Sequence, residues 1–179
     1  MKKIDIDDYA GLITKELKRG ILISTNADKY NSMVIGWGNI GTVWNRETFV
    51  CYVRDSRYTK GQLDKSGEFT VSVPLNGPDP VINRVCGVMS GRDVDKVKEV
   101  GMTVASPCVT GTPGILEYPL TLECRVLYSH KEAVSDILED IQNKFYPERR
   151  APGPDSSADP HTMYIGEIVS AYILEEQDV

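Results

Sequence analysis

One segment, residues 49–74, constrains the fold most, because two strand patterns and a short helix follow one another in it directly. Residues 49–53 form a compact apolar run that favours β structure. Residues 58–65 have a composition compatible with a helix, which Gly67 is placed to end. Residues 68–73 alternate apolar and polar side chains, which is the period of a strand. The sequence therefore predicts a strand, a short helix and a second strand.

Basic and hydroxyl side chains gather where the predicted helix begins. Arg54, Arg57 and Lys60 supply positive charge, while Ser56 and Thr59 supply hydroxyl groups. The first N–H groups of a helix lack intrahelical partners and attract anions, and Ser56 can cap this first turn. The cluster indicates an anion site. A solvated basic turn beside an ordinary helix cap explains the same residues at least as well, since neither a P-loop nor a G-x-G-x-x-G pattern occurs.

Composition limits the classes of protein to which the chain can belong. A chain of 179 residues with 41% apolar and 26% charged residues suits one globular domain, residues 1–179. A net charge of −6 argues against nucleic-acid binding, which requires broad positive surfaces. The N-terminal residues lack the apolar core of a signal peptide, and no run is apolar enough to cross a membrane. We expect a cytoplasmic protein.

The cysteines and histidines do not form a metal-binding pattern. They are Cys51, Cys86, Cys108, Cys124, His130 and His161. The cysteines include no C-x-x-C pair, and neither histidine has ligand-like spacing to them. We expect no metal site and structural thiols, while thiol redox chemistry stays open for Cys86 and Cys108.

Hydrophobic periodicity predicts the remaining elements. Helices are expected at 6–18, 93–100 and 131–145, and strands at 20–25, 31–37, 120–128 and 163–174. Residues 81–88 are short and mixed, and 147–160 are interpreted as a mobile excursion. Several antiparallel strands with a few short helices predict a mainly β, α+β barrel.

Glycines surround the first tryptophan. Gly36, Gly38 and Gly41 flank Trp37, and glycine beside a strand marks a bulge or a close approach to the backbone. The pattern can leave a flat slot for a planar ring. A barrel corner with a core tryptophan explains it better when the residues are taken alone.

Four motifs resemble one family. Residues 56–74 resemble its S-R-Y-T-K-G-x-L-x-K-S-G-E-F-T-V-S-V-P segment, and residues 86–96 its C-G-x-x-S-G-R-D-x-D-K stretch. Residues 161–167 are similar to its H-T-x-F-x-G-E strand, and 31–33 with Trp37 to its flavin-facing strand. The matches occur in order, so the chain is identified as an FMN-binding split barrel of the flavin reductase or flavoredoxin type. The resemblance implies Greek-key antiparallel strands, short peripheral helices, and a homodimer with FMN near the interface.

The resemblance also implies roles for individual residues. The FMN phosphate would be held at the helix start by Arg54, Ser56, Arg57, Tyr58, Thr59 and Lys60. The isoalloxazine would be lined by Asn31, Ser32, Met33, Gly36 and Trp37. The flavin edge or phosphate would be approached by Cys86, Ser90 and Arg92, and the reactive face by His161. Arg92 is the candidate for stabilising the reduced ring, and no protein nucleophile or base is needed.

The implied function is an FMN-dependent oxidoreductase. It would pass hydride or electrons from NADH, NADPH or a redox partner to a flavin, a ferric complex or a protein. A non-catalytic module that binds flavin or another phosphate ligand is the alternative, and a structural oligomerisation barrel is a third reading. The chain departs from the family in a longer insertion at 131–160 and in a missing tail that would place an aromatic side chain over the flavin. Tyr146 and Tyr164 are candidates for that aromatic.

Overall fold

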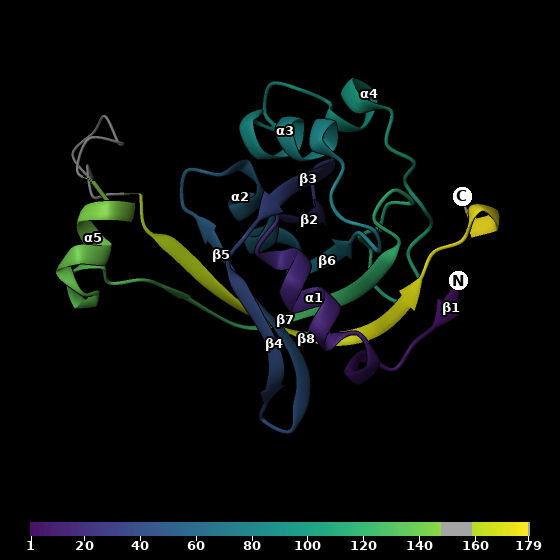
Figure 1. Ribbon diagram of the computed structural model, residues 1–179. Helices are drawn as coiled ribbons and strands as arrows, with labels where there is room; N and C mark the ends of the chain where they lie inside the picture. Colours follow the sequence, from purple (N-terminus) through teal and green to yellow (C-terminus); the bar gives the residue numbers. More distant parts are fainter. Residues whose placement is uncertain (148–158, 179) are drawn as a thin grey trace.

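The computed structural model describes residues 1–147 and 159–178, and its centre is an eight-stranded sheet (Figure 1). The strands are β1 (Lys2–Lys3), β2 (Ile21–Asn26), β3 (Tyr30–Ile35), β4 (Gly38–Val43), β5 (Arg46–Arg54), β6 (Glu68–Val73), β7 (Leu120–Lys131) and β8 (His161–Ile173). Their order is β3-β2-β6-β7-β8-β5-β4, with β1 paired to β8 off this path. These pairings are all antiparallel, and the sheet is not closed. The predicted mainly β split barrel is confirmed.

The core lies between the apolar faces of the strands, as the alternation predicts. Phe69 pairs with Cys124 and Val71 with Leu122 across β6 and β7, and all four side chains are fully buried. Gly166 of β8 faces this cluster, and a Cβ there would lie 2.5 Å from the Phe69 ring. Only glycine therefore fits against Phe69 at this position.

Short helices surround the barrel. They are η1 (Ile6–Asp8), α1 (Ala10–Leu17), α2 (Tyr58–Ser66), α3 (Pro80–Val88), α4 (Lys96–Val100), η2 (Val134–Asp136), α5 (Glu139–Phe145) and η4 (Glu176–Asp178). Gly67 and Gly101 end α2 and α4 in the left-handed conformation, as expected from their positions. No helix in the described part of the chain is long and apolar enough to cross a membrane.

Helix α3 was not predicted from the mixed sequence of residues 81–88. Its start carries a clear signal, because the Asp79 carboxylate accepts hydrogen bonds from the N–H groups of Val81 and Ile82. Pro80 occupies the first turn, where its missing N–H costs nothing. The cap, rather than the periodicity, identifies this helix.

The interpretation of the glycine-rich segment as a barrel corner with a core tryptophan is wrong. Residues 38–43 form β4, which pairs with β5 in a hairpin. Trp44 and Asn45 make its turn with positive φ angles, and Trp44 is 62% exposed. Trp37 is 39% exposed and lies just before β4. Both tryptophans are available to contact other groups.

The predicted helix at 131–145 is wrong in its first half. Strand β7 continues to Lys131, which pairs with Thr162 of β8, and the chain then forms η2 and α5. We call residues 132–147 with 159 and 160 the arm. Figure 1 shows α5 at the far ends of β7 and β8, on the opposite side of the molecule from both termini. The predicted excursion at 147–160 falls, except for Pro147, Asp159 and Pro160, outside the described residues.

Candidate functional site

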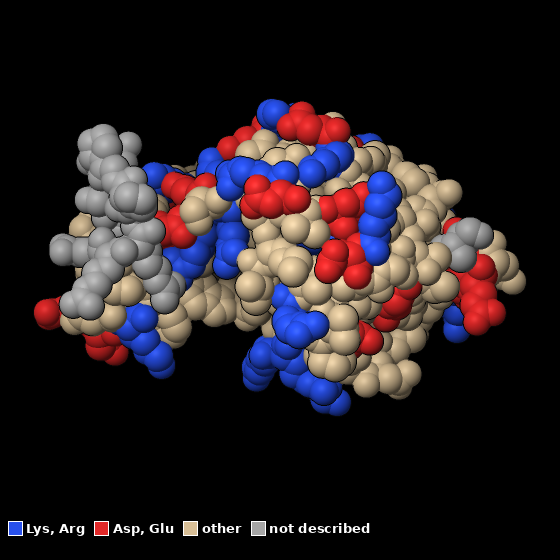
Figure 2. All heavy atoms as spheres, turned by 90° about the horizontal axis from the view of Figure 1, so that it is seen from above, with Lys and Arg blue, Asp and Glu red and all other residues tan. Residues whose placement is uncertain are grey.

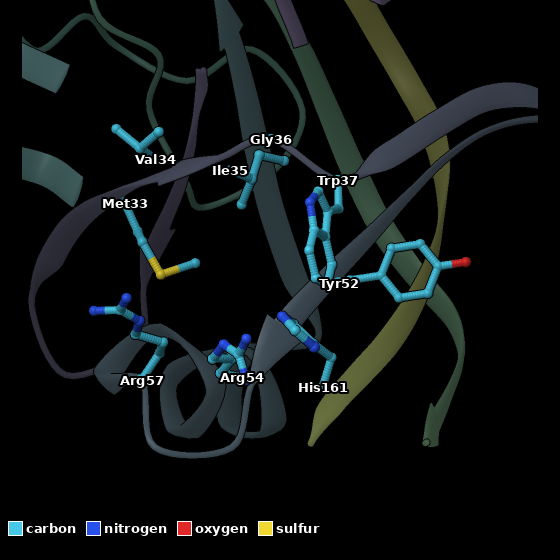
Figure 3. A pocket seen from close by; sticks show the side chains of 9 residues that line it. All are labelled: Met33, Val34, Ile35, Gly36, Trp37, Tyr52, Arg54, Arg57 and His161. Atoms are coloured by element: carbon cyan, nitrogen blue, oxygen red, sulfur yellow. The ribbon is translucent and has the colours of Figure 1, made fainter. Parts of the chain in front are cut away.

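A cavity of about 190 Å³, the tryptophan hollow, opens between β3, β5 and the start of β8 (Figure 3). It is lined by Met33, Val34, Ile35, Gly36, Trp37, Tyr52, Arg54, Arg57 and His161. Trp37 and His161 lie with ring centroids 4.7 Å apart and planes tilted by 40°. Figure 3 shows Arg54, Arg57 and His161 on one side, with the β3 residues across the hollow. Apolar side chains of β3 thus lie across the hollow from two guanidinium groups.

A second cavity of about 110 Å³, the anion hollow, adjoins the start of α2. It is lined by Asn31, Met33, Ser56, Arg57, Tyr58, Thr59, Met89, Ser90, Gly91, Arg92 and Lys96. Met33 and Arg57 line both hollows, which therefore adjoin at these side chains. Figure 2 shows Lys and Arg side chains gathered between the arm and the barrel. This positive patch contrasts with the negative net charge of the chain.

Asn31 lines the anion hollow and is itself buried. Its Nδ2 donates a hydrogen bond of 2.9 Å to Thr59 Oγ1. Its Oδ1 is buried and finds no hydrogen-bond partner within residues 1–147 and 159–178. A Cβ at Gly91 would overlap this oxygen and approach Tyr58 Cδ1 to 2.8 Å, so glycine lets the loop before α4 lie directly on Asn31. A buried acceptor without a donor is costly and indicates a site that a ligand can complete.

Lys96 belongs to the site although sequence reasoning did not select it. Its ammonium group donates to the carbonyls of Ser32 at 2.8 Å and Cys86 at 3.2 Å. The side chain is only 5% exposed, and burial lowers its pKa. Lys96 is the last residue of the motif at 86–96, which is the signal that could have identified it.

The expected phosphate-binding residues at the start of α2 separate into two groups. Arg57, Tyr58 and Thr59 line the anion hollow. Lys60 instead pairs with Asp64 on the next turn, at 2.6 Å, and is not among the described residues that line either hollow. The Lys60 ammonium group is therefore paired with a carboxylate of its own helix and not placed in the anion hollow.

Ser56 does not cap α2, so that prediction is wrong. The N-cap residue is Arg57, whose guanidinium has no acceptor and leaves the first N–H groups uncapped by its side chain. Ser56 lines the anion hollow, but its N–H and hydroxyl donate to the Asp159 carboxylate at 2.9 and 2.7 Å. Arg54 lines the tryptophan hollow and donates to the carbonyls of Phe145 and Asp159. Both residues join the arm to the barrel.

Two residues expected to contact the flavin, Ser32 and Cys86, line neither hollow in the part of the chain that the structure describes. Both side chains are buried. Ser32 Oγ lies 2.6 Å from Ser24 Oγ. Cys86 packs in an apolar cluster with Ile82 and Met102. Burial raises the pKa of the Cys86 thiol to about 11. Thiolate chemistry at Cys86 is therefore disfavoured at neutral pH.

Ser90 and Arg92 lie in the anion hollow rather than in the tryptophan hollow. The Ser90 hydroxyl accepts the Arg92 N–H at 3.2 Å, and Arg92 Nη1 donates to the Ser56 carbonyl at 3.2 Å. The Arg92 guanidinium also lies 5.8 Å from the Tyr58 ring centroid. Arg92 is thus held beside the start of α2.

His161 is supported from the arm. The Tyr146 hydroxyl lies 2.9 Å from His161 Nδ1 and 2.7 Å from Glu132 Oε2. Burial and then the Arg54 guanidinium lower the pKa of His161, while burial and Glu132 raise the pKa of Tyr146. Tyr146 therefore contacts His161 from the arm. Tyr164, the other candidate aromatic, is buried, and its hydroxyl donates a hydrogen bond of 2.7 Å to Asp64 Oδ1. Sequence reasoning missed Glu132 because only the folded chain places it beside His161.

Comparison with known proteins assigns the class. The family model described as flavin reductase like domain matches residues 16–179, so the chain belongs to this family. It is 26% identical over 146 residues to an uncharacterized protein from Archaeoglobus fulgidus, covering 71% of this chain and 80% of that protein.

Solved structures share the fold. Flavoredoxin from Methanosarcina acetivorans is 26% identical with a TM-score of 0.62, over 90% of this chain and 70% of that chain. The FMN-binding domain of a flavin reductases-like enzyme from Shewanella baltica is 14% identical with a TM-score of 0.64, over 96% and 75% of the two chains. The second likeness is one of fold alone, and membership of the family supports flavin binding.

Proposed function

We propose that this protein binds FMN and transfers hydride or electrons as an oxidoreductase. The observation that carries the proposal is that two adjoining hollows share Met33 and Arg57, one of them lined partly by aromatic side chains and the other by cationic ones. A ligand with a planar ring at one end and a phosphate at the other fits this division. FMN is such a ligand.

The donors and acceptors of the anion hollow fit FMN chemically. Arg57, Arg92 and the uncapped first turn of α2 can donate hydrogen bonds to a phosphate. The Oδ1 of Asn31 has no donor among the described residues, and a ribityl hydroxyl group of FMN is of the kind that could supply one. The anion hollow therefore offers donors for a phosphate and an acceptor for a hydroxyl group.

The roles of the site residues follow from their placement. Arg57, Thr59, Ser90 and Arg92 would hold the phosphate end, while Trp37 and the β3 backbone would lie along the ring. Arg57 lines both hollows, so we assign the stabilisation of added negative charge on the ring to Arg57 and Arg54 in place of Arg92. Bound FMN supplies the redox chemistry, and the protein binds it, orients it and tunes it by charge.

The arm provides a route for the second reactant. An apolar hollow of about 470 Å³ between the arm and the barrel shares Trp37 and Tyr52 with the tryptophan hollow. We propose that the electron donor or acceptor, NADH, NADPH, a small molecule or a protein, reaches the ring from this side. A homodimer, a cytoplasmic location and a single functional domain over residues 1–179 stay predictions.

The absorbance spectrum tests the proposal directly. Protein mixed with FMN and freed of excess cofactor should keep a flavin spectrum, and NADH or NADPH should bleach it under anaerobic conditions. A colourless protein that does not take up FMN would overturn FMN binding. A flavin spectrum that resists both nucleotides and chemical mediators would favour the non-catalytic binding module.

Two variants of α2 test the assignment of the phosphate end. Arg57→Ala removes a cation that lines both hollows, and charge-assisted hydrogen bonds contribute about 1.5–3 kcal/mol, so the Kd for FMN should rise about tenfold or more. Lys60→Ala removes a cation already paired with Asp64 and should change the Kd less than about threefold. Equilibrium titration of FMN fluorescence measures both. Equal losses in the two variants would contradict the placement of the phosphate beside Arg57.

A further inference from the structure

His161, Tyr146 and Glu132 form a hydrogen-bonded cluster where the arm meets the tryptophan hollow. Tyr146 and His161 are 5% and 6% exposed, and the Glu132 side chain is 22% exposed. Glu132 Oε2 lies 2.7 Å from the Tyr146 hydroxyl and 3.2 Å from the His161 backbone nitrogen. The Tyr146 hydroxyl lies 2.9 Å from His161 Nδ1. The Glu132 carboxylate, the Tyr146 hydroxyl and the His161 ring therefore contact one another in a mostly buried cluster.

The supply of protons decides the direction of each bond. The hydroxyl of Tyr146 has a single hydrogen, and a carboxylate can only accept. The contact between Tyr146 and Glu132 Oε2 therefore uses the tyrosine proton. The tyrosine oxygen can then only accept in its contact with His161 Nδ1. That nitrogen must carry a hydrogen.

We infer that Glu132, acting through Tyr146, holds neutral His161 as the Nδ1–H tautomer and leaves Nε2 as a hydrogen-bond acceptor in the tryptophan hollow. The protonated ring nitrogen of a histidine is set by the bond that the other nitrogen makes. Glu132 and Tyr146 are therefore positioning residues. Neither lies in the motif of residues 161–167 that contains the histidine.

The tautomer has a consequence for ligand choice. Arg54 and Arg57 offer donors to the tryptophan hollow, while His161 Nε2 offers an acceptor. The hollow then selects a ring that presents an N–H or O–H group toward His161 and acceptor or anionic groups toward the arginines. This ligand class rests on the proposed function, whereas the position of the proton on His161 does not.

Nitrogen NMR of the flavin-free protein tests the proton position. The chain has only two histidines, and His130 is exposed, with its ring stacked on Tyr128, so it serves as an internal control. Long-range ¹H–¹⁵N correlation above the ordinary histidine pKa should show a protonated Nδ1 and an unprotonated Nε2 for His161. The His130→Gln variant assigns the signals. A protonated Nε2 on wild-type His161 would overturn the inference whatever the variants do.

Two substitutions test the role of Glu132. In Glu132→Ala the tyrosine proton has no carboxylate to occupy it, so Tyr146 should donate to Nδ1 and the His161 tautomer should shift to Nε2–H. Glu132→Gln keeps an oxygen that accepts from both Tyr146 and the His161 N–H, so the tautomer should stay as in the wild type. An unchanged tautomer in a folded Glu132→Ala variant would remove Glu132 from the assignment. If that variant does not fold, the wild-type spectrum still decides which nitrogen of His161 carries the proton. A shift to the Nε2–H tautomer in Glu132→Gln would then contradict the role given to Glu132.

Adding FMN to the labelled protein separates this inference from the proposed function. The His161 Nε2 resonance should shift toward a hydrogen-bonded value while His130 stays unchanged. FMN that binds without moving Nε2 would overturn the ligand class alone. Protein that does not bind FMN would overturn the proposed function, while the tautomer measured without flavin would stand.

Discussion

The barrel and the arm are stabilised by different kinds of contact. Phe49 and Phe69 of the barrel are fully buried among strands, where the gain in free energy follows the apolar area removed from water. In the arm, α5 buries none of its residues, Leu138 is 72% exposed and Ile141 is 38% exposed. Tyr146 is the buried arm side chain that contacts His161. The barrel therefore depends on packing, and the arm on a few directed bonds.

The directed bonds of the arm converge on residues near the tryptophan hollow. Arg54 donates to the carbonyls of Phe145 at 2.9 Å and Asp159 at 2.8 Å. Ser56 donates to the Asp159 carboxylate, and the Phe145 ring meets Trp37 edge-on with centroids 5.1 Å apart. The same side chains that line the hollows thus also position the arm. Changes in the arm should reach the site more readily than changes in the outer barrel.

The largest effect should come from breaking the packing of the barrel. Phe69→Ala removes a fully buried ring that lies against Gly166, and the close strands cannot collapse to fill the space. Such truncations cost about 3–5 kcal/mol of unfolding free energy. Chemical denaturation followed by tryptophan fluorescence and circular dichroism measures the loss.

Leu138→Ala in the arm is the matched control. Its side chain is mostly exposed, so the unfolding free energy should change by less than about 0.5 kcal/mol. A comparable loss in both variants would mean that the arm packs on a surface that contributes to global stability, and the contrast between the two regions would fail.

The contrast also explains which parts of the fold could be predicted. Alternation of apolar and polar residues predicted β6 and most of β7, because a strand that is buried on one face has an apolar residue at every second position. Helical periodicity was less reliable. Apolar residues at helical spacing predicted one helix over residues 131–145, and its first half is wrong. Lys131 pairs with Thr162, a partner distant in sequence, and that pairing overrides the local pattern. Local signals predict elements, and distant partners decide where they end.

A smaller effect, confined to the arm, is expected for Arg54→Leu. The substitution leaves the carbonyls of Phe145 and Asp159 without their charged donor, at a cost of about 1.5–3 kcal/mol. Amide hydrogen exchange in the described part of the arm should become about tenfold to a hundredfold faster, measured without flavin. Exchange in β6 and β7 should change much less.

Arg46→Leu on the same strand is the control for Arg54→Leu. Arg46 is half-exposed and pairs with Glu167, so its loss should cost about 0.2–1 kcal/mol and leave arm exchange unchanged. Arm exchange that stays slow in Arg54→Leu would show that other contacts, such as Trp37 with Phe145, hold the arm. Faster arm exchange in both variants would point to a general effect of β5.

The candidate site was predictable where its residues lie in continuous motifs. Arg57 and Thr59 lie two positions apart at the start of α2, and both line the anion hollow as expected. Lys60, one position further, rotates to Asp64 because a helix turns each successive side chain by about 100°. The support of His161 by Glu132 could not be predicted, since it depends on how the arm folds back. Side chains that act through tertiary contacts leave no spacing signal.

The smallest expected effect is a pH dependence located where the arm meets the barrel. Burial and the nearby Arg54 lower the pKa of His161 in the folded protein, whereas the unfolded chain has the ordinary value near 6.5. Between these values the unfolded chain binds a proton that the folded chain does not, so acid favours unfolding. The contribution of His161 is complete above about pH 6.5 and is lost as the pH falls through the folded pKa, at most about 1.4 kcal/mol per pH unit. Unfolding free energies from about pH 7.5 to about pH 5.5 should show this slope in the wild type and in His130→Gln, but a shallower slope in His161→Gln. An equal slope in His161→Gln would assign the pH dependence to groups outside this contact, and His161 would then be no more shielded by the arm than an exposed histidine.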